Sequence, residues 1–145
     1  MNEQHYTASI TVGAGPHEVY KGIRDVAAWW NEFEGSAEKV NDEFTVQFGD
    51  VHVSTQKLIE LIPDKKIVWL VTDSSINFVD KKQEWTGTKI SFEITEKNGK
   101  TEILFTHLGL VPSIQCYEGC SKGWDYYFKG SLYKWLTEGK GTPGL

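Results

Sequence analysis

His107 and the two cysteines, Cys116 and Cys120, are the side chains best suited to acid–base or nucleophilic chemistry. His107 lies in phase with Ile103 and Phe105, so we expect it to face the interior, where it could act as a general base or a polar anchor for a ligand. A core or rim histidine satisfied by its protein neighbours is the interpretation that we favour. Cysteines four residues apart on a helix are too distant for a disulfide. They also have no adjacent histidine, so they do not form a zinc site. We interpret both as small buried thiols.

No other pattern is typical of a catalytic or metal site. No serine lies in a nucleophile-elbow sequence, and no pair of histidines has metal-ligand spacing. The segment Gly13–Gly15 lacks the lysine and the Ser/Thr of a phosphate loop. We therefore predict no catalytic residue, no metal and no cofactor. An enzyme of the cyclase or hydrolase kind stays open as an alternative, with His107 and Tyr117 or Tyr126 as acid or base.

Aromatic side chains are the main indication of function. The 145 residues include six Trp, six Tyr and seven Phe, and each such ring can bury roughly 150–250 Å². Rings between a sheet and a helix would either fill a solid core or line a cavity for a small hydrophobic molecule. The residues alone leave both arrangements open. A cavity would lie between Trp30, Trp69, Phe105 and Trp124, and its candidate binding residues are Trp29, Trp30, Phe44, Phe48, Trp69, Phe92, Phe105, His107, Cys120, Trp124 and Phe128.

Charge and hydropathy exclude several classes of partner. The formal net charge is −5 and the charges are interspersed, whereas a nucleic-acid groove needs clustered Lys and Arg. No segment approaches the roughly 20 apolar residues that span a bilayer, and the N-terminus does not resemble a secretory signal. We expect one cytoplasmic domain spanning residues 1–145, without nucleic-acid binding or membrane insertion.

The first half of the chain predicts a strand, two short helices and an antiparallel meander. Apolar and polar residues alternate over Tyr6–Val12, and Pro16 suits the first turn of a helix. Asp25 can cap a second short helix that includes Trp29 and Trp30. Further strands are expected at Gly35–Val40, Phe44–Phe48, Val51–Ile62 and Ile67–Thr72, with Asp73–Gln83 as a loop or an irregular edge.

The second half predicts a hairpin and one long helix. Alternation over Ile90–Thr95 leads to Asn98–Gly99, a favoured two-residue turn. Apolar residues then recur every four positions over Cys116–Thr137, which predicts one continuous helix. Its glycines at 119, 123 and 130 each cost roughly 1 kcal/mol against alanine, which indicates a close approach of backbone or room left for something. The tail Gly141–Leu145 is expected to be loose.

This order of elements, with strands bounded by helices, predicts an α+β fold. Three segments resemble the SRPBCC (START-like) superfamily, most closely its AHSA-type group, named after the activator of the heat-shock chaperone ATPase. The segments are Ser9–Val12 with Pro16, Val19 and Trp29–Trp30; Lys100–Leu110; and Gly123–Phe128 with Leu132 and Leu136.

The resemblance implies a helix-grip fold, in which a curved antiparallel sheet wraps around the C-terminal helix and encloses a cavity. Members of the superfamily include lipid carriers, hormone receptors, cyclases and cochaperone domains, so function depends on the site. Our first hypothesis is a protein that binds a hydrophobic, ring-containing or lipid-like molecule. The alternative is a cochaperone-like or stress-related interaction domain, with a chaperone partner and a monomeric or homodimeric state.

Overall fold

Alternation of buried and exposed side chains builds one sheet of seven antiparallel strands. The computed structural model describes residues 5–80 and 82–144, and its strands lie in the order β1-β7-β6-β5-β4-β3-β2. In β1 every second side chain is buried, which turns one face of the strand to the core. The strands are β1 (Tyr6–Val12), β2 (Phe33–Gly35), β3 (Glu43–Phe48), β4 (His52–Ile62), β5 (Lys66–Ile76), β6 (Lys89–Lys97) and β7 (Lys100–Leu108).

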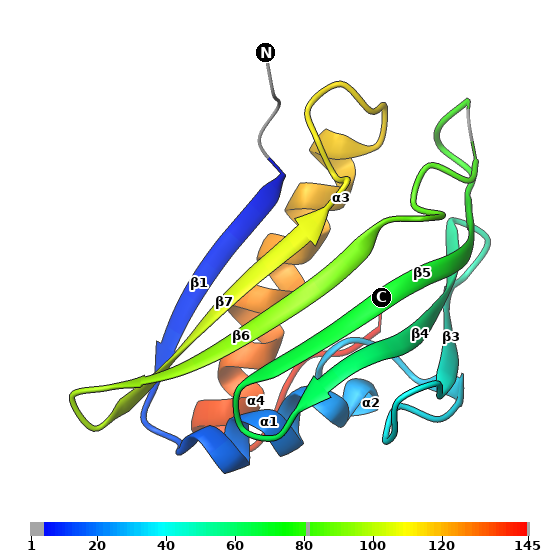
Figure 1. Cartoon of the computed structure of the whole chain (residues 1–145). Coiled ribbons are helices and arrows are strands. Elements are labelled where there is room, and N and C mark those ends of the chain that lie inside the picture. Colours follow the sequence, from blue (N-terminus) through cyan, green and yellow to red (C-terminus); the bar gives the residue numbers. More distant parts are fainter. Residues whose placement is uncertain (1–4, 81, 145) are drawn as a thin grey trace.

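The helices lie against one face of this sheet. Figure 1 shows the long C-terminal helix, coloured yellow to orange, running along the curved sheet, with α1 and α2 near one end of it. The helical segments are α1 (Pro16–Arg24), α2 (Val26–Trp29), α3 (Tyr117–Trp124), η1 (Asp125–Leu132) and α4 (Tyr133–Glu138). The predicted α+β helix-grip architecture is therefore confirmed.

The predicted hairpin between β6 and β7 is also confirmed. Asn98 and Gly99 have φ angles of 53° and 80°, and the flanking residues Lys97 and Lys100 pair with each other. Two consecutive positive φ angles match the twist of the adjoining strands, and asparagine followed by glycine adopts them at low cost. The turn fixes the register that places Phe92 opposite Phe105 in the core.

Two strand predictions were wrong. The strand expected at Gly35–Val40 ends at Gly35, because Asp42 holds the following residues in a loop: its carboxylate accepts hydrogen bonds from the Ser36 hydroxyl and from two backbone N–H groups. The strand expected to end at Thr72 instead continues to Ile76. Register shifts in β4 allow the longer pairing, since the ladder resumes beyond them and buries Ile76.

The predicted helix Cys116–Thr137 is one uninterrupted helical run, but its middle is wound differently from its ends. The eight residues of η1 have π-helical geometry, in which each N–H reaches back five residues. The four-residue recurrence still identified the inner face, because Cys120, Trp124, Phe128 and Leu132 are all buried. Phe128 is completely buried, with its ring centroid 4.9 Å from that of Phe105.

The C-terminal tail is held in place, contrary to the expectation of a loose end. The Thr142 N–H donates to Ser131 Oγ over 2.7 Å, and the Gly144 N–H donates to the Trp30 carbonyl over 2.9 Å. The Tyr127 hydroxyl donates to the Gly144 carbonyl over 2.5 Å. Hydropathy could not predict this, because backbone groups make most of the contacts. Residue 145, the last of the predicted segment, lies outside the described residues.

Candidate functional site

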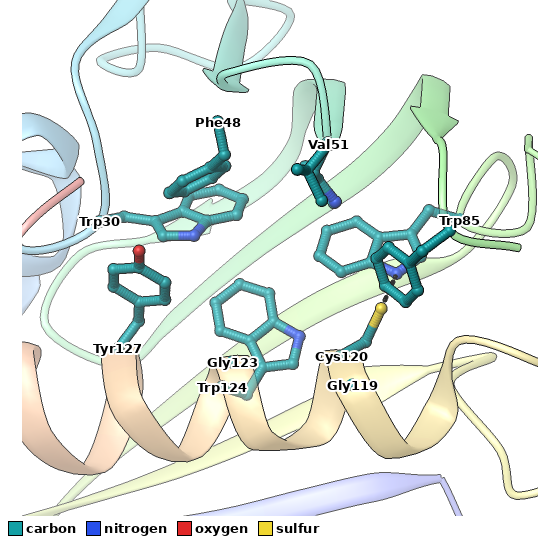
Figure 2. A pocket seen from close by; sticks show the side chains of 11 residues that line it. Trp30, Phe48, Val51, Trp85, Gly119, Cys120, Gly123, Trp124 and Tyr127 are labelled. Atoms are coloured by element: carbon teal, nitrogen blue, oxygen red, sulfur yellow. Dashed lines mark hydrogen bonds between the residues drawn. The ribbon is translucent and has the colours of Figure 1, made fainter. Parts of the chain in front are cut away.

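A pocket of about 230 Å³ opens between the first half of the C-terminal helix and the strands that face it. Figure 2 shows Trp30 and Phe48 on one side, Trp85 on the other, and Trp124 and Tyr127 rising from the helix. The complete lining is Trp30, Phe48, Val51, His52, Phe78, Trp85, Gly119, Cys120, Gly123, Trp124 and Tyr127. The walls are therefore mostly aromatic.

Glycine gives the helical wall its room. Five helix residues share the face that lines the pocket: Gly119, Cys120, Gly123, Trp124 and Tyr127. A Cβ atom added to Gly123 would meet nothing within 4 Å, so this glycine leaves open space. A Cβ atom on Gly119 would lie 3.2 Å from the Phe78 ring, so this glycine lets the neighbouring loop approach. The interpretation that a helical glycine leaves room for something therefore fits Gly123, whereas the close neighbour of Gly119 is a side chain and not backbone.

The loop that joins β5 to β6 is fastened to the start of the helix. Its Glu84 carboxylate accepts hydrogen bonds from the backbone N–H groups of Gln115 and Cys116, over 3.0 and 2.9 Å. These N–H groups lie at the positive end of the helix, which stabilises a carboxylate. The Asp80 N–H, also in the loop, donates to Gln115 Oε1 over 2.9 Å. The helix and the loop thus form one continuous pocket wall.

Trp85 is the main side chain that this loop contributes. Its Nε1–H donates to Cys120 Sγ over 3.3 Å, as drawn in Figure 2, and its ring stacks on Trp124 with centroids 5.8 Å apart. Phe78 and Val51 border the same pocket and remain 49% and 44% exposed. Exposed apolar side chains around an apolar pocket are typical of a binding surface.

The core beneath the pocket is solid. We predicted a space between Trp30, Trp69, Phe105 and Trp124, but the rings themselves fill it: Trp30 lies 6.0 Å from Trp69 and 5.0 Å from Trp124, and Phe105 lies 4.7 Å from Trp124, between centroids. These are ordinary separations for packed aromatic pairs. The cavity is therefore displaced towards the helix start, above the layer that Trp30 and Trp124 form.

His107 is a satisfied core histidine. Its side chain is completely buried; Nδ1 accepts the Trp124 Nε1–H over 3.0 Å, and Nε2 lies 2.8 Å from Thr88 Oγ1. Because the Thr88 hydroxyl donates to the Trp85 carbonyl over 2.6 Å, we assign the proton of His107 to Nε2. Burial lowers the pKa of His107 to about 3. The ring does not line the pocket, so the enzyme alternative loses its proposed base.

The pocket wall carries no charge near neutral pH. None of its residues is Lys, Arg, Asp or Glu. Burial lowers the pKa of His52 to about 4, and burial raises the pKa of Tyr127. The pKa of the Cys120 thiol is raised by its hydrogen bond with the Cys116 thiol and by burial, so Cys120 is a poor nucleophile. Both cysteines are free and buried, as predicted.

A short row of polar side chains continues from the pocket along β4. His52 Nε2 lies 3.1 Å from Ser54 Oγ, which also accepts a hydrogen bond from Gln56 Nε2. Gln56 Oε1 and Trp69 Nε1 are buried and, among the described residues, have no hydrogen-bond partner. No group of three or more His, Cys, Asp or Glu in the described part of the chain could hold a metal ion.

Residues 17–137 match the family described as Activator of Hsp90 ATPase homolog 1-like protein. The match spans most of the chain. The protein belongs to this family. The AHSA-type resemblance read from the three sequence segments is therefore confirmed, and no curated protein matches this member by sequence.

Solved structures similar to this family member share its fold. The Aha1 dimer from Colwellia psychrerythraea is 25% identical, with a TM-score of 0.78 over 97% of this chain and 100% of that one. SSP2350 from Staphylococcus saprophyticus is 12% identical, with a TM-score of 0.70 over 96% of each chain. DynU16, from the dynemicin biosynthetic locus, is 15% identical with a TM-score of 0.70, and the match covers 97% of this chain but 49% of that one.

Four of the eleven predicted binding residues of this AHSA1-like chain line the pocket: Trp30, Phe48, Cys120 and Trp124. The other seven are buried below or beside it: Trp29, Phe44, Trp69, Phe92, Phe105, His107 and Phe128. Their inward orientation followed from strand and helix phase. A role in binding stays a prediction for the four, and the geometry gives the seven no surface on the pocket.

Sequence reasoning missed several residues of the wall in this AHSA1-like protein, most clearly Trp85, Phe78 and Tyr127. Trp85 and Phe78 lie in the irregular segment between β5 and β6, where periodicity gives no facing. A signal was present, because large apolar side chains are unusual in an otherwise polar loop and indicate that the loop packs on something.

Among the described residues, no helix is long and apolar enough to cross a membrane.

Proposed function

We propose that this protein binds a small, uncharged, largely apolar molecule in the pocket above Trp30 and Trp124. The observation that carries the proposal is the open space at Gly123, where a side chain would meet nothing within 4 Å although aromatic rings surround it. Rings that border a void lack contact atoms on one side and lose dispersion energy. A ligand would restore those contacts.

The size of the pocket favours a ligand of two or three fused rings. An engineered cavity of about 150 Å³ in another protein holds benzene. The pocket here measures about 230 Å³ and is open at Phe78 and Val51, so a longer molecule could extend past the mouth. With few polar groups on the wall, selection should depend on shape more than on hydrogen bonding. We place this activity in the cytoplasm, where free thiols such as Cys116 and Cys120 are ordinarily maintained.

The test is a ligand screen with a blocked pocket as control. Neutral polycyclic compounds and lipids are added to the protein, and binding is followed by tryptophan fluorescence and by the melting temperature, which a ligand raises by mass action. Gly123→Leu should fill the open space and abolish both responses. Lys122→Leu, an exposed substitution on the same turn, adds the same side chain outside the pocket and should leave both unchanged. Equal responses of the two variants would place the binding elsewhere.

A second function, contact with a chaperone or with another copy of the chain, is favoured by the family itself and by one surface feature. Leu104 and Leu108 lie on the strand β7 and are each 39% exposed. The Colwellia psychrerythraea relative forms a dimer. Sedimentation velocity of the wild type and of Leu104→Lys/Leu108→Lys tests this: a dimer that the double variant dissociates supports it, and a monomer in both rules out self-association through these leucines.

A further inference from the structure

We propose that the indole N–H of Trp30 is the polar anchor of the pocket, and that the ligand is an uncharged ring compound whose ketone, ether or similar oxygen accepts a hydrogen bond from it. This proposal rests on the pocket being the binding site proposed above. It identifies the polar end of the ligand and the residue that recognises it, in place of His107, one anchor that the sequence suggested.

The hydrogen-bond acceptors of the six indole N–H groups distinguish Trp30 from the other tryptophans. Four donate within the protein: Trp29 to the Ile23 carbonyl, Trp85 to Cys120, Trp124 to His107 and Trp135 to the Gly22 carbonyl. Trp69 Nε1 is buried in the core without a partner. Trp30 remains: its indole lines the pocket, and its N–H has no acceptor among the described residues.

The position of Trp30 suits a donor that acts on a bound molecule. Its side chain is 98% shielded from solvent, since its relative exposure is 2%, and Figure 2 shows the nitrogen edge of the ring turned to the pocket side that Trp124 faces. Unlike Trp69 Nε1, the Trp30 nitrogen still reaches solvent at the pocket wall. A ligand that displaces this solvent must supply an acceptor or leave the donor unpaired, at a cost of roughly 1–3 kcal/mol. The unpaired donor and the open space at Gly123 therefore border the same pocket.

The ring of Trp30 is also held rigidly. It stacks on Trp69 with an interplanar angle of 7°, and it packs against Trp124 and Phe48 at centroid distances of 5.0 and 6.1 Å. Its backbone carbonyl accepts the Gly144 N–H of the C-terminal tail. A donor fixed in this way loses little conformational freedom when a ligand binds, which favours affinity and directional selection.

Apart from Nδ1 of His52, the remaining polar side-chain atoms of the wall are already engaged. The Trp85 N–H is taken by Cys120, the Tyr127 hydroxyl donates to Gly144, and His52 uses Nε2 with Ser54. None of the lining residues is Lys or Arg, so a carboxylate would enter without a counter-charge and lose its hydration. The wall therefore selects a neutral acceptor against a fatty-acid-like anion.

Three ligands of matched shape test the proposal: fluorenone has a ketone oxygen, fluorene has none, and fluorene-9-carboxylate carries a charge. Affinities are measured by isothermal titration calorimetry. One neutral hydrogen bond corresponds to a roughly 2–12-fold difference in affinity, so fluorenone should bind more tightly than fluorene by that factor. The carboxylate should bind at least about tenfold more weakly than the ketone.

Trp30→Phe should bring the ratio of fluorenone to fluorene affinity to about one. The matched control is Trp135→Phe, which removes an indole N–H that the Gly22 carbonyl already accepts outside the pocket and should preserve the ratio. Should Trp30→Phe fail to fold, ¹H–¹⁵N spectra of the wild type replace it: the Trp30 indole proton should move downfield with fluorenone and not with fluorene. Equal affinities of ketone and hydrocarbon, or tightest binding of the carboxylate, overturn the anchor and leave the pocket function standing. Binding of none of the three overturns both.

Discussion

Acidification should destabilise this protein through His107, and the size of the effect follows from its surroundings. The buried imidazole stays neutral down to a pKa of about 3, whereas in the unfolded chain it takes up a proton near pH 6.5. Between these values the unfolded state binds more protons, so the free energy of unfolding falls as the pH falls. From pH 7 to pH 5, His107 alone should remove about 2 kcal/mol of stability. His52, with a pKa of about 4, acts in the same direction.

The perturbation that isolates this effect is His107→Gln. Its amide can accept a hydrogen bond from Trp124 and donate one to Thr88, as the imidazole does, but it does not titrate. Urea unfolding at pH 7 and pH 5, followed by tryptophan fluorescence, gives the loss for each protein. The wild-type loss should exceed that of the variant by about 2 kcal/mol. Equal losses would refute the reasoning, as would imidazole ¹⁵N shifts showing a protonated His107 in the folded protein at pH 5.

Two further predictions concern packing and the fastening of the loop. Phe128→Ala should destabilise the protein by roughly 3–5 kcal/mol, because the ring is completely buried against Phe105; a loss below about 0.5 kcal/mol in urea unfolding would contradict that placement. Glu84→Ala should cost about 1 kcal/mol and speed hydrogen exchange at the Cys116 N–H, since two backbone donors at the helix start lose their acceptor; unchanged exchange would show that the loop is held by other contacts.

Much of the fold could be predicted because local sequence patterns determine where most of its strands, turns and helices lie. Period-two alternation placed β1, β3, β6 and β7, and the Asn98–Gly99 pair located the hairpin turn. A four-residue recurrence gave both the extent and the inner face of the C-terminal helix. Errors fell where a distant contact overrides the local pattern, as with Asp42, which ends β2, and with the ladder that extends β5 to Ile76.

The candidate site was harder to predict than the fold, for a related reason. Phase shows which side chains point inward, but not whether the rings that meet there leave a gap. Trp69 and Phe105 point inward and are packed solid, whereas Gly123, with no side chain, makes the opening. Trp85 reaches the pocket only because Glu84, its neighbour, binds the start of a helix some thirty residues away. Such tertiary hydrogen bonds leave no periodic trace in the sequence.

The indole N–H signals of the six tryptophans give the most direct test of binding in this pocket. Trp30, Trp85 and Trp124 line it, whereas Trp29, Trp69 and Trp135 do not, so each spectrum contains its own control. On titration with a neutral polycyclic ligand, the ¹H–¹⁵N signals of the three lining indoles should shift and saturate together, and those of the other three should move much less. Uniform shifts, or shifts confined to the other three, would contradict binding above Trp30 and Trp124.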